Sequence, residues 1–158
     1  MTFTERFQTF VCEGDSICCE VQGFEIIARI VRDDCPDAPD QRQDGFWPSL
    51  YKDAPGFIGP GPNHRERFAQ AQTRAEAVME AWRKDEWFYC GIVLSVALEG
   101  VILDAHAASL WGVEANYPGS ANAYLTEVAE ELLPEALDAG RAAARRLCAA
   151  LETNGARA

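Results

Sequence analysis

The stretch from Asp33 to Asn63 most constrains the fold, because it forbids a long helix or strand across this part of the chain. It holds six of the eight prolines and four of the twelve glycines. Proline fixes φ and removes a backbone donor, so regular elements end here. Loops this long in a compact domain are usually functional or disordered. The large apolar side chains of the segment 46–58 would be costly to leave in water, so we expect them to pack on the core or on a partner.

The chain before this stretch has the pattern of strands. Residues 7–12 and 17–21 have a two-residue alternation, residues 24–31 continue in β-branched side chains, and turn sequences stand between them at Glu13-Gly14-Asp15 and Gln22-Gly23. This pattern predicts a two- or three-stranded antiparallel meander. The segment 24–31 also fits a 3.6-residue period, so a short helix there is the alternative.

A helix and a hairpin are predicted after the proline-rich stretch. Asn63 and Glu66 have the spacing of a capping box, and Asp85-Glu86 closes the helix. Its apolar stripe consists of Phe68, Ala71, Ala75, Val78, Met79 and Trp82. Strands at 87–98 and 101–105 then surround Glu99-Gly100, a hairpin turn sequence. Residues 110–114 fit a third short strand or the exit from one.

The last third is predicted to be helical, since apolar residues recur at steps of three and four from Tyr124 to Leu151. Pro134 lacks an amide hydrogen, so it is expected to kink this helix or begin a second one.

With 158 residues, the chain fits one domain, 1–158. The predicted fold class is α+β. An antiparallel sheet (N-terminal meander plus central hairpin) packs against one central helix and a long C-terminal helical region.

Charge is the most informative bulk property. Fourteen Lys and Arg against 25 Asp and Glu give a formal net charge of −11. A protein that binds nucleic acid directly needs clustered cations to neutralise phosphates. This chain would be repelled by nucleic acid and by anionic membranes, and attracted to basic surfaces. Acidity is also a common route to solubility, so charge alone does not decide between the two interpretations.

The motifs of catalysis and of metal or cofactor binding are missing. His64 and His106 are the only histidines, and neither has a Cys or a second His at ligand spacing. No G-x-S-x-G occurs, and Gly59-Pro60-Gly61-Pro62 has no following Lys to make it a phosphate loop. We therefore expect no cofactor and no enzymatic activity.

The expected location is the cytoplasm of a bacterial host cell. The first ten residues lack the basic and apolar regions of a signal peptide, and no apolar run approaches the length of a membrane span. The six cysteines have irregular spacing without C-x-x-C, which indicates reduced thiols in a reducing compartment.

Three short motifs resemble a group of small proteins of unknown function encoded by phages and other mobile elements. Their pattern is E-W-W-x-x-G-I, then L-W-G-I-E, then Y-L before an acidic helix. Here the matching segments are 86–92 (EWFYCGI), 110–114 (LWGVE) and Tyr124-Leu125, so the resemblance covers about the second half of the chain. Phe88 replaces the second tryptophan and Val113 the isoleucine. The resemblance implies a genomic context, in which small acidic proteins block host defence.

The leading hypothesis is therefore a protein-binding inhibitor, an anti-CRISPR or related anti-defence protein. Its partner would be a host defence complex with a basic nucleic-acid-binding surface, such as a CRISPR surveillance complex. For the alanine-rich stripe Ala142–Ala150, a homodimer through the C-terminal helix and packing on the sheet are equal alternatives. The alternative function is a small enzyme or ligand-binding protein with the Phe46–Ile58 loop as a pocket lid. The candidate partner-binding residues are the acids Asp33, Asp34, Asp37, Asp40, Glu127, Glu130, Glu131 and Asp138.

Overall fold

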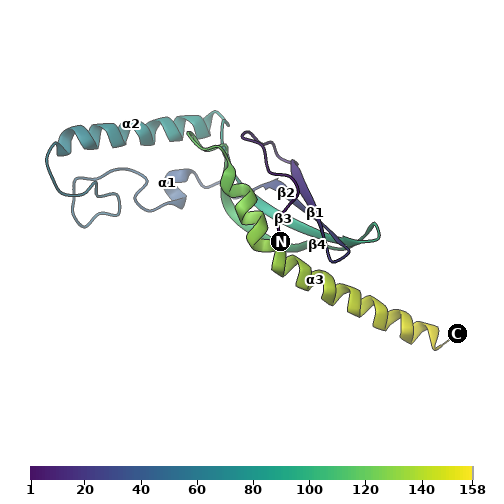
Figure 1. Cartoon of the computed structure of the whole chain (residues 1–158). Coiled ribbons are helices and arrows are strands. Elements are labelled where there is room, and N and C mark those ends of the chain that lie inside the picture. The colour runs from purple at the N-terminus through teal and green to yellow at the C-terminus, as the bar shows by residue number, and fades with distance from the viewer. Residues whose placement is uncertain (158) are drawn as a thin grey trace. The chain divides into compact units, whose positions relative to one another are not determined.

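The computed structural model describes residues 1–157, and the chain forms two compact units (Figure 1). The first unit contains Met1–Asp33 together with the chain from Tyr89 onwards. The second unit is the intervening segment Asp34–Phe88, which includes nearly all of the proline-rich stretch. That the whole chain behaves as a single domain stays a prediction.

The first unit is built on a four-stranded antiparallel sheet in the order β1-β2-β3-β4. The strands are β1 Ser16–Val21, β2 Phe24–Arg32, β3 Phe88–Leu98 and β4 Val101–Ala115. Ser16 pairs with Arg29, and Phe24 pairs with Leu98, so β2 lies between β1 and β3. The α+β class is confirmed, and the segment 24–31 is a strand rather than the alternative helix.

Two tight turns set the register of the sheet. Glu99 (φ 50°) and Gly100 (φ 76°) join β3 to β4, and Gln22 (φ 55°) and Gly23 (φ 84°) join β1 to β2. Two consecutive residues with positive φ match the right-handed twist of paired strands. These turns explain why local sequence identified both hairpins.

A single long helix, α3 (Ala123–Gly155), covers one face of the sheet (Figure 1). Beneath it Ile26, Ile30, Ile92 and Leu94 have no exposed surface. Pro134 lies inside α3, which continues through it to Gly155. The predicted C-terminal helix is thus confirmed, and the alternative of a second helix beginning at Pro134 is wrong.

The segment 7–12 is not a strand, so the three-stranded form of the N-terminal meander is wrong. Its backbone bonds to side chains instead of to a neighbouring strand. Phe7 N–H donates to Thr126 Oγ1 (3.1 Å), Val11 N–H donates to Asn116 Oδ1 (2.9 Å), and Asn122 Nδ2 donates to the carbonyl of Thr9 (3.0 Å). Since these groups satisfy the backbone polar atoms, the segment needs no strand partner.

The predicted strands 101–105 and 110–114 are parts of one element. β4 runs without interruption from Val101 to Ala115. The indole of Trp111 lies against Gly91 of β3, because a Cβ built on Gly91 would meet Trp111 Cε3 at 2.5 Å. Only glycine at position 91 allows this close approach.

The second unit contains two helices, α1 Pro39–Arg42 and α2 His64–Arg83, joined by an irregular loop. The capping box predicted at Asn63 is wrong, because Asn63 adopts a left-handed conformation (φ 58°) and its side chain makes no capping hydrogen bond. Instead, the guanidinium of Arg67 donates to the carbonyls of Pro62 and Ile58, which ties the loop to the first turn of α2. That α2 packs on the sheet stays a prediction.

Candidate protein-binding surface

The first part of α3 is held firmly on the sheet by its apolar face. Leu125, Leu133 and Leu137 are at most 1% exposed. At Gly140 the helix comes so close that an added Cβ would meet Val96 Cγ2 at 2.8 Å. Packing this tight fixes which face of α3 is directed away from the sheet.

That outward face carries an acidic ridge, which we define as Glu127, Glu131, Glu135 and Asp138. All four side chains are exposed. Their spacing of four, four and three residues places them on one line along the helix. The ridge therefore presents four carboxylates from one rigid element.

The ridge is poorly neutralised by the protein itself. Arg141 Nη1 lies 3.0 Å from Asp138 Oδ1, at the end of the ridge. Within the described residues, Glu127, Glu131 and Glu135 have no ion pair and no side-chain hydrogen bond. Like charges at i,i+4 destabilise a helix by about 0.2–0.5 kcal/mol per pair. The Glu127–Glu131 and Glu131–Glu135 pairs thus lower stability, and packing on the sheet must offset this cost.

Three of the four candidates predicted on this helix belong to the ridge. Glu130 does not, because it is rotated from Glu131 by about 100° around the helix axis and is half-buried. Glu135, which is exposed, belongs to the ridge but is missing from the predicted set. Counting residues at steps of three and four from Glu127 would have selected it.

The four candidate aspartates before α2 are divided between the units. Asp33 is the last residue of the first segment of unit one, and its N–H donates to the carbonyl of Tyr89 (3.0 Å). Asp34, Asp37 and Asp40 belong to the second unit, where Asp40 Oδ2 accepts a hydrogen bond from Trp47 Nε1 (3.2 Å). The eight predicted acids therefore do not form one continuous surface on a single unit.

Groups with perturbed pKa values lie beside the first turn of α3. The hydroxyl of Tyr124 donates a hydrogen bond to the carbonyl of Glu114. Burial raises the pKa of Tyr124 to about 12 and also raises the pKa of the Glu114 carboxyl. Burial, with a smaller contribution from Asp33, raises the pKa of the Cys90 thiol to about 12. A thiol with so high a pKa is a poor nucleophile at neutral pH.

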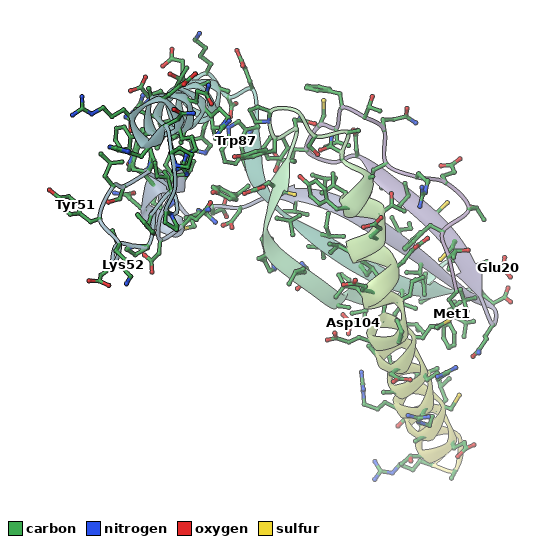
Figure 2. The ribbon with its side chains drawn as sticks, turned by 60° about the vertical axis from the view of Figure 1, so that its left-hand side comes forward. Met1, Glu20, Tyr51, Lys52, Trp87 and Asp104 are labelled. Atoms are coloured by element: carbon green, nitrogen blue, oxygen red, sulfur yellow. The ribbon has the colours of Figure 1, made fainter. Side chains whose placement is uncertain are left out.

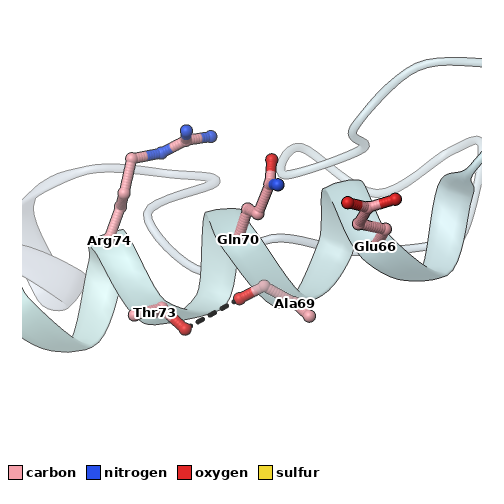
Figure 3. A pocket seen from close by; sticks show the side chains of 5 residues that line it. All are labelled: Glu66, Ala69, Gln70, Thr73 and Arg74. Atoms are coloured by element: carbon pink, nitrogen blue, oxygen red, sulfur yellow. Dashed lines mark hydrogen bonds between the residues drawn. The ribbon is translucent and has the colours of Figure 1, made fainter.

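The second unit contains shallow hollows. One, of about 320 Å³, is lined by Leu50, Phe57, Ile58, Gly59, Pro60, Gly61 and His64. Another lies along α2 and is lined only by Glu66, Ala69, Gln70, Thr73 and Arg74 (Figure 3). In the latter, Thr73 Oγ1 donates to the carbonyl of Ala69, four residues before it (2.9 Å). Side chains from one face of one helix do not enclose a ligand.

No group of three or more His, Cys, Asp or Glu side chains in residues 1–157 is arranged to hold a metal ion. Among the helices of the described chain, none has the length and apolar character needed to cross a membrane.

Comparisons with protein-family models, with curated proteins and with solved structures find no match to this chain.

Proposed function

We propose that this protein is a protein-binding inhibitor from a mobile element, of the anti-CRISPR or related anti-defence kind. It acts without catalysis, in the cytoplasm of a bacterial host. The ridge of Glu127, Glu131, Glu135 and Asp138 contacts the basic surface on which a surveillance complex holds nucleic acid. Occupying this surface excludes the normal ligand by sterics and by charge.

The observation that carries the proposal is the lack of intramolecular neutralisation along the ridge. Three of its four carboxylates have no cationic partner within the described residues, although two like-charge pairs weaken the helix. A basic partner would convert these repulsions into ion pairs. The net charge of −11 adds a long-range attraction that speeds the encounter.

The test is co-elution of the purified protein with members of a panel of surveillance complexes in size-exclusion chromatography. The proposal predicts co-elution with at least one complex at low salt and a steep loss at higher salt, because screening weakens contacts between exposed charges. A variant with the whole ridge neutralised (Glu127→Gln, Glu131→Gln, Glu135→Gln, Asp138→Asn) is expected to lose the complex.

The matched control removes the same number of charges elsewhere. Four exposed glutamates that are not part of the ridge serve this purpose: Glu5→Gln, Glu20→Gln, Glu66→Gln and Glu76→Gln. This control is expected to keep most of the binding. Equal loss in both variants would show that only net charge matters. Unchanged binding by the ridge variant would remove the ridge from the interface.

A second candidate function, ligand binding, is favoured by the hollow of about 320 Å³ in the second unit. Its volume is near the lower limit of known ligand pockets. The loop residues Phe57 and Ile58 line it together with His64, so the predicted lid segment forms part of its wall. Binding of a small molecule there would respond little to salt. His64→Ala would weaken such binding, whereas the ridge variant would not.

A further inference from the structure

The two edges of the sheet are covered differently. In the described chain, β1 and β4 each have a strand neighbour on one side only, and we call the side of β4 directed away from β3 its outer edge. The N-terminal segment bonds to β1, because Thr4 Oγ1 donates a hydrogen bond to the carbonyl of Cys18 (2.9 Å). Within residues 1–157, no backbone group of another segment bonds to the outer edge of β4.

The strand that forms this uncovered edge is long and carries little charge. β4 has 15 residues, and Asp104 is the sole Asp, Glu, Lys or Arg between Val101 and Val113. The apolar side chains of Val101 and Ile102 are 60% and 67% exposed. Long apolar edge strands with few charges pair readily with strands of other chains. Natural sheets therefore carry features along such edges that prevent this pairing.

The turn before β4 determines which of its backbone groups lie on the outer edge. Glu99-Gly100 is a two-residue turn, so Leu98 and Val101 form the hydrogen-bonded pair that closes the hairpin. Hydrogen bonding alternates along an antiparallel strand, so in this part of β4 every second residue after Val101 bonds to β3. The residues between them, which include Asp104 and His106, direct their backbone N–H and C=O groups outwards.

The side chain of Asp104 occupies one of these outward groups. Asp104 Oδ1 accepts a hydrogen bond from the backbone N–H of His106 (2.9 Å). Figure 2 shows Asp104 and Glu20 on opposite sides of the sheet, on β4 and on β1. A side-chain bond of this kind competes with strand pairing for the same donor. An incoming strand would have to break a charge-assisted hydrogen bond and bring its carbonyl oxygens close to the carboxylate.

We propose that the Asp104 carboxylate blocks strand pairing along the outer edge of β4, and so prevents two copies of this chain from joining their sheets edge to edge. The carboxylate removes the His106 donor from use and places a negative charge where the partner strand would present carbonyl oxygens. In a two-fold pairing both copies would have to give up this bond, so its effect would count twice. The block acts on the fold itself, whether or not the acidic ridge binds a partner.

Two substitutions at position 104 test the block. Asp104→Ala removes both the acceptor and the charge, whereas Asp104→Asn keeps a side-chain oxygen that can accept from His106 N–H. In sedimentation velocity at high micromolar concentration, Asp104→Ala is expected to form larger species than the wild type, and Asp104→Asn to sediment like the wild type. The matched control is Glu20→Ala, which removes one exposed charge from β1 and is expected to sediment like the wild type.

Amide hydrogen exchange measures the capping bond directly. In dilute protein the His106 amide of Asp104→Ala is expected to exchange roughly tenfold faster than that of the wild type, because a hydrogen bond to a charged acceptor is lost. In Asp104→Asn it is expected to stay close to the wild-type rate. A wild-type rate in Asp104→Ala, together with wild-type sedimentation, would overturn the proposal. Association of Asp104→Asn equal to that of Asp104→Ala would also overturn it, since charge alone would then be responsible.

A second site locates the new contact. His106→Pro removes the outward N–H without removing a bond to β3, and proline is tolerated at such edge positions. Combined with Asp104→Ala, it is expected to restore the sedimentation of the wild type, because the pairing strand then lacks this donor. A double variant that associates as strongly as Asp104→Ala would place the contact away from the outer edge of β4 and contradict the proposal.

Discussion

The two parts of α3, which we call the packed half (residues 123–143) and the exposed half (residues 144–155), have the same apolar pattern but opposite surroundings. In residues 123–143, the stripe is buried against the sheet, and Leu133 has no exposed surface. In residues 144–155, the stripe is solvent-exposed, and Leu151 is 71% exposed. Periodicity therefore determines which side chains share a face, whereas the length of the sheet determines where that face is covered.

The largest expected effect on the free energy of unfolding comes from making the same substitution, leucine to alanine, in each half of α3. Leu133→Ala removes a fully buried side chain and is expected to lower the free energy of unfolding by about 2–5 kcal/mol. Leu151→Ala removes an exposed one and is expected to change it by less than about 0.5 kcal/mol in dilute protein. Urea unfolding followed by far-UV circular dichroism measures both. Equal losses in dilute protein would mean that residues 144–155 are covered within one chain.

A second pair of substitutions compares the two glycines of α3. Gly140→Ala places a Cβ about 2.8 Å from Val96 Cγ2, so we expect a loss of about 1–3 kcal/mol from overpacking. Gly155→Ala meets nothing within 4 Å and is expected to be neutral or slightly stabilising. The same unfolding measurement applies. A stabilising Gly140→Ala would show that the helix shifts on the sheet at little cost, and would weaken the contrast between the halves.

Much of the first unit was predictable because its signals are local. The turns at Gln22-Gly23 and Glu99-Gly100 identify two hairpins from adjacent residues, and the 3.6-residue period identifies α3. These features depend on backbone preferences that a short window of sequence contains. Three of the four helical candidate acids belong to the ridge for the same reason, since spacing alone places them on one face.

The wrong predictions depend on partners distant in sequence. The segment 7–12 has the alternation of a strand, but Asn116, Asn122 and Thr126 provide its hydrogen bonds from more than 100 residues away. Asn63 has capping-box spacing, yet Arg67 holds the preceding loop and Asn63 takes a left-handed conformation. No local pattern indicates that α3 extends beyond the sheet, because predicting this would require the lengths of the helix and the sheet and their placement against each other.

The pH dependence of stability tests the burial of Glu114 beside the first turn of α3. Burial raises the pKa of Glu114, whose carbonyl accepts the hydrogen bond from Tyr124 in the first turn of α3. The unfolded chain releases the Glu114 proton at pH values above its ordinary pKa of 4.5, whereas the folded protein still holds it there. The contribution of Glu114 to the free energy of unfolding is therefore expected to fall as the pH rises from about 4.5 through the raised pKa of the folded state.

Glu114→Gln is expected to remove this part of the pH dependence. The quantity to measure is the difference in free energy of unfolding between wild type and Glu114→Gln from pH 4 to pH 8. It should move in favour of the variant as the pH rises above about 4.5 and then become constant. A difference that moves in favour of the wild type would mean that ionised Glu114 is stabilised at this junction, contrary to the desolvation argument.

The smallest effect concerns the acidic ridge, which exists only on the packed half. Glu131→Gln removes two like-charge pairs, with Glu127 and with Glu135, and is expected to raise the free energy of unfolding by about 0.4–1 kcal/mol at low salt. Glu127→Gln removes one pair and is expected to give about half of that gain. Both gains should shrink in 1 M NaCl, where the screening length is about 3 Å.

A stabilised variant that also loses its partner would show that the ridge favours binding at the expense of stability. If Glu131→Gln is neutral at low salt, the ridge has no stability cost, and the argument that it is kept for a partner loses its physical basis.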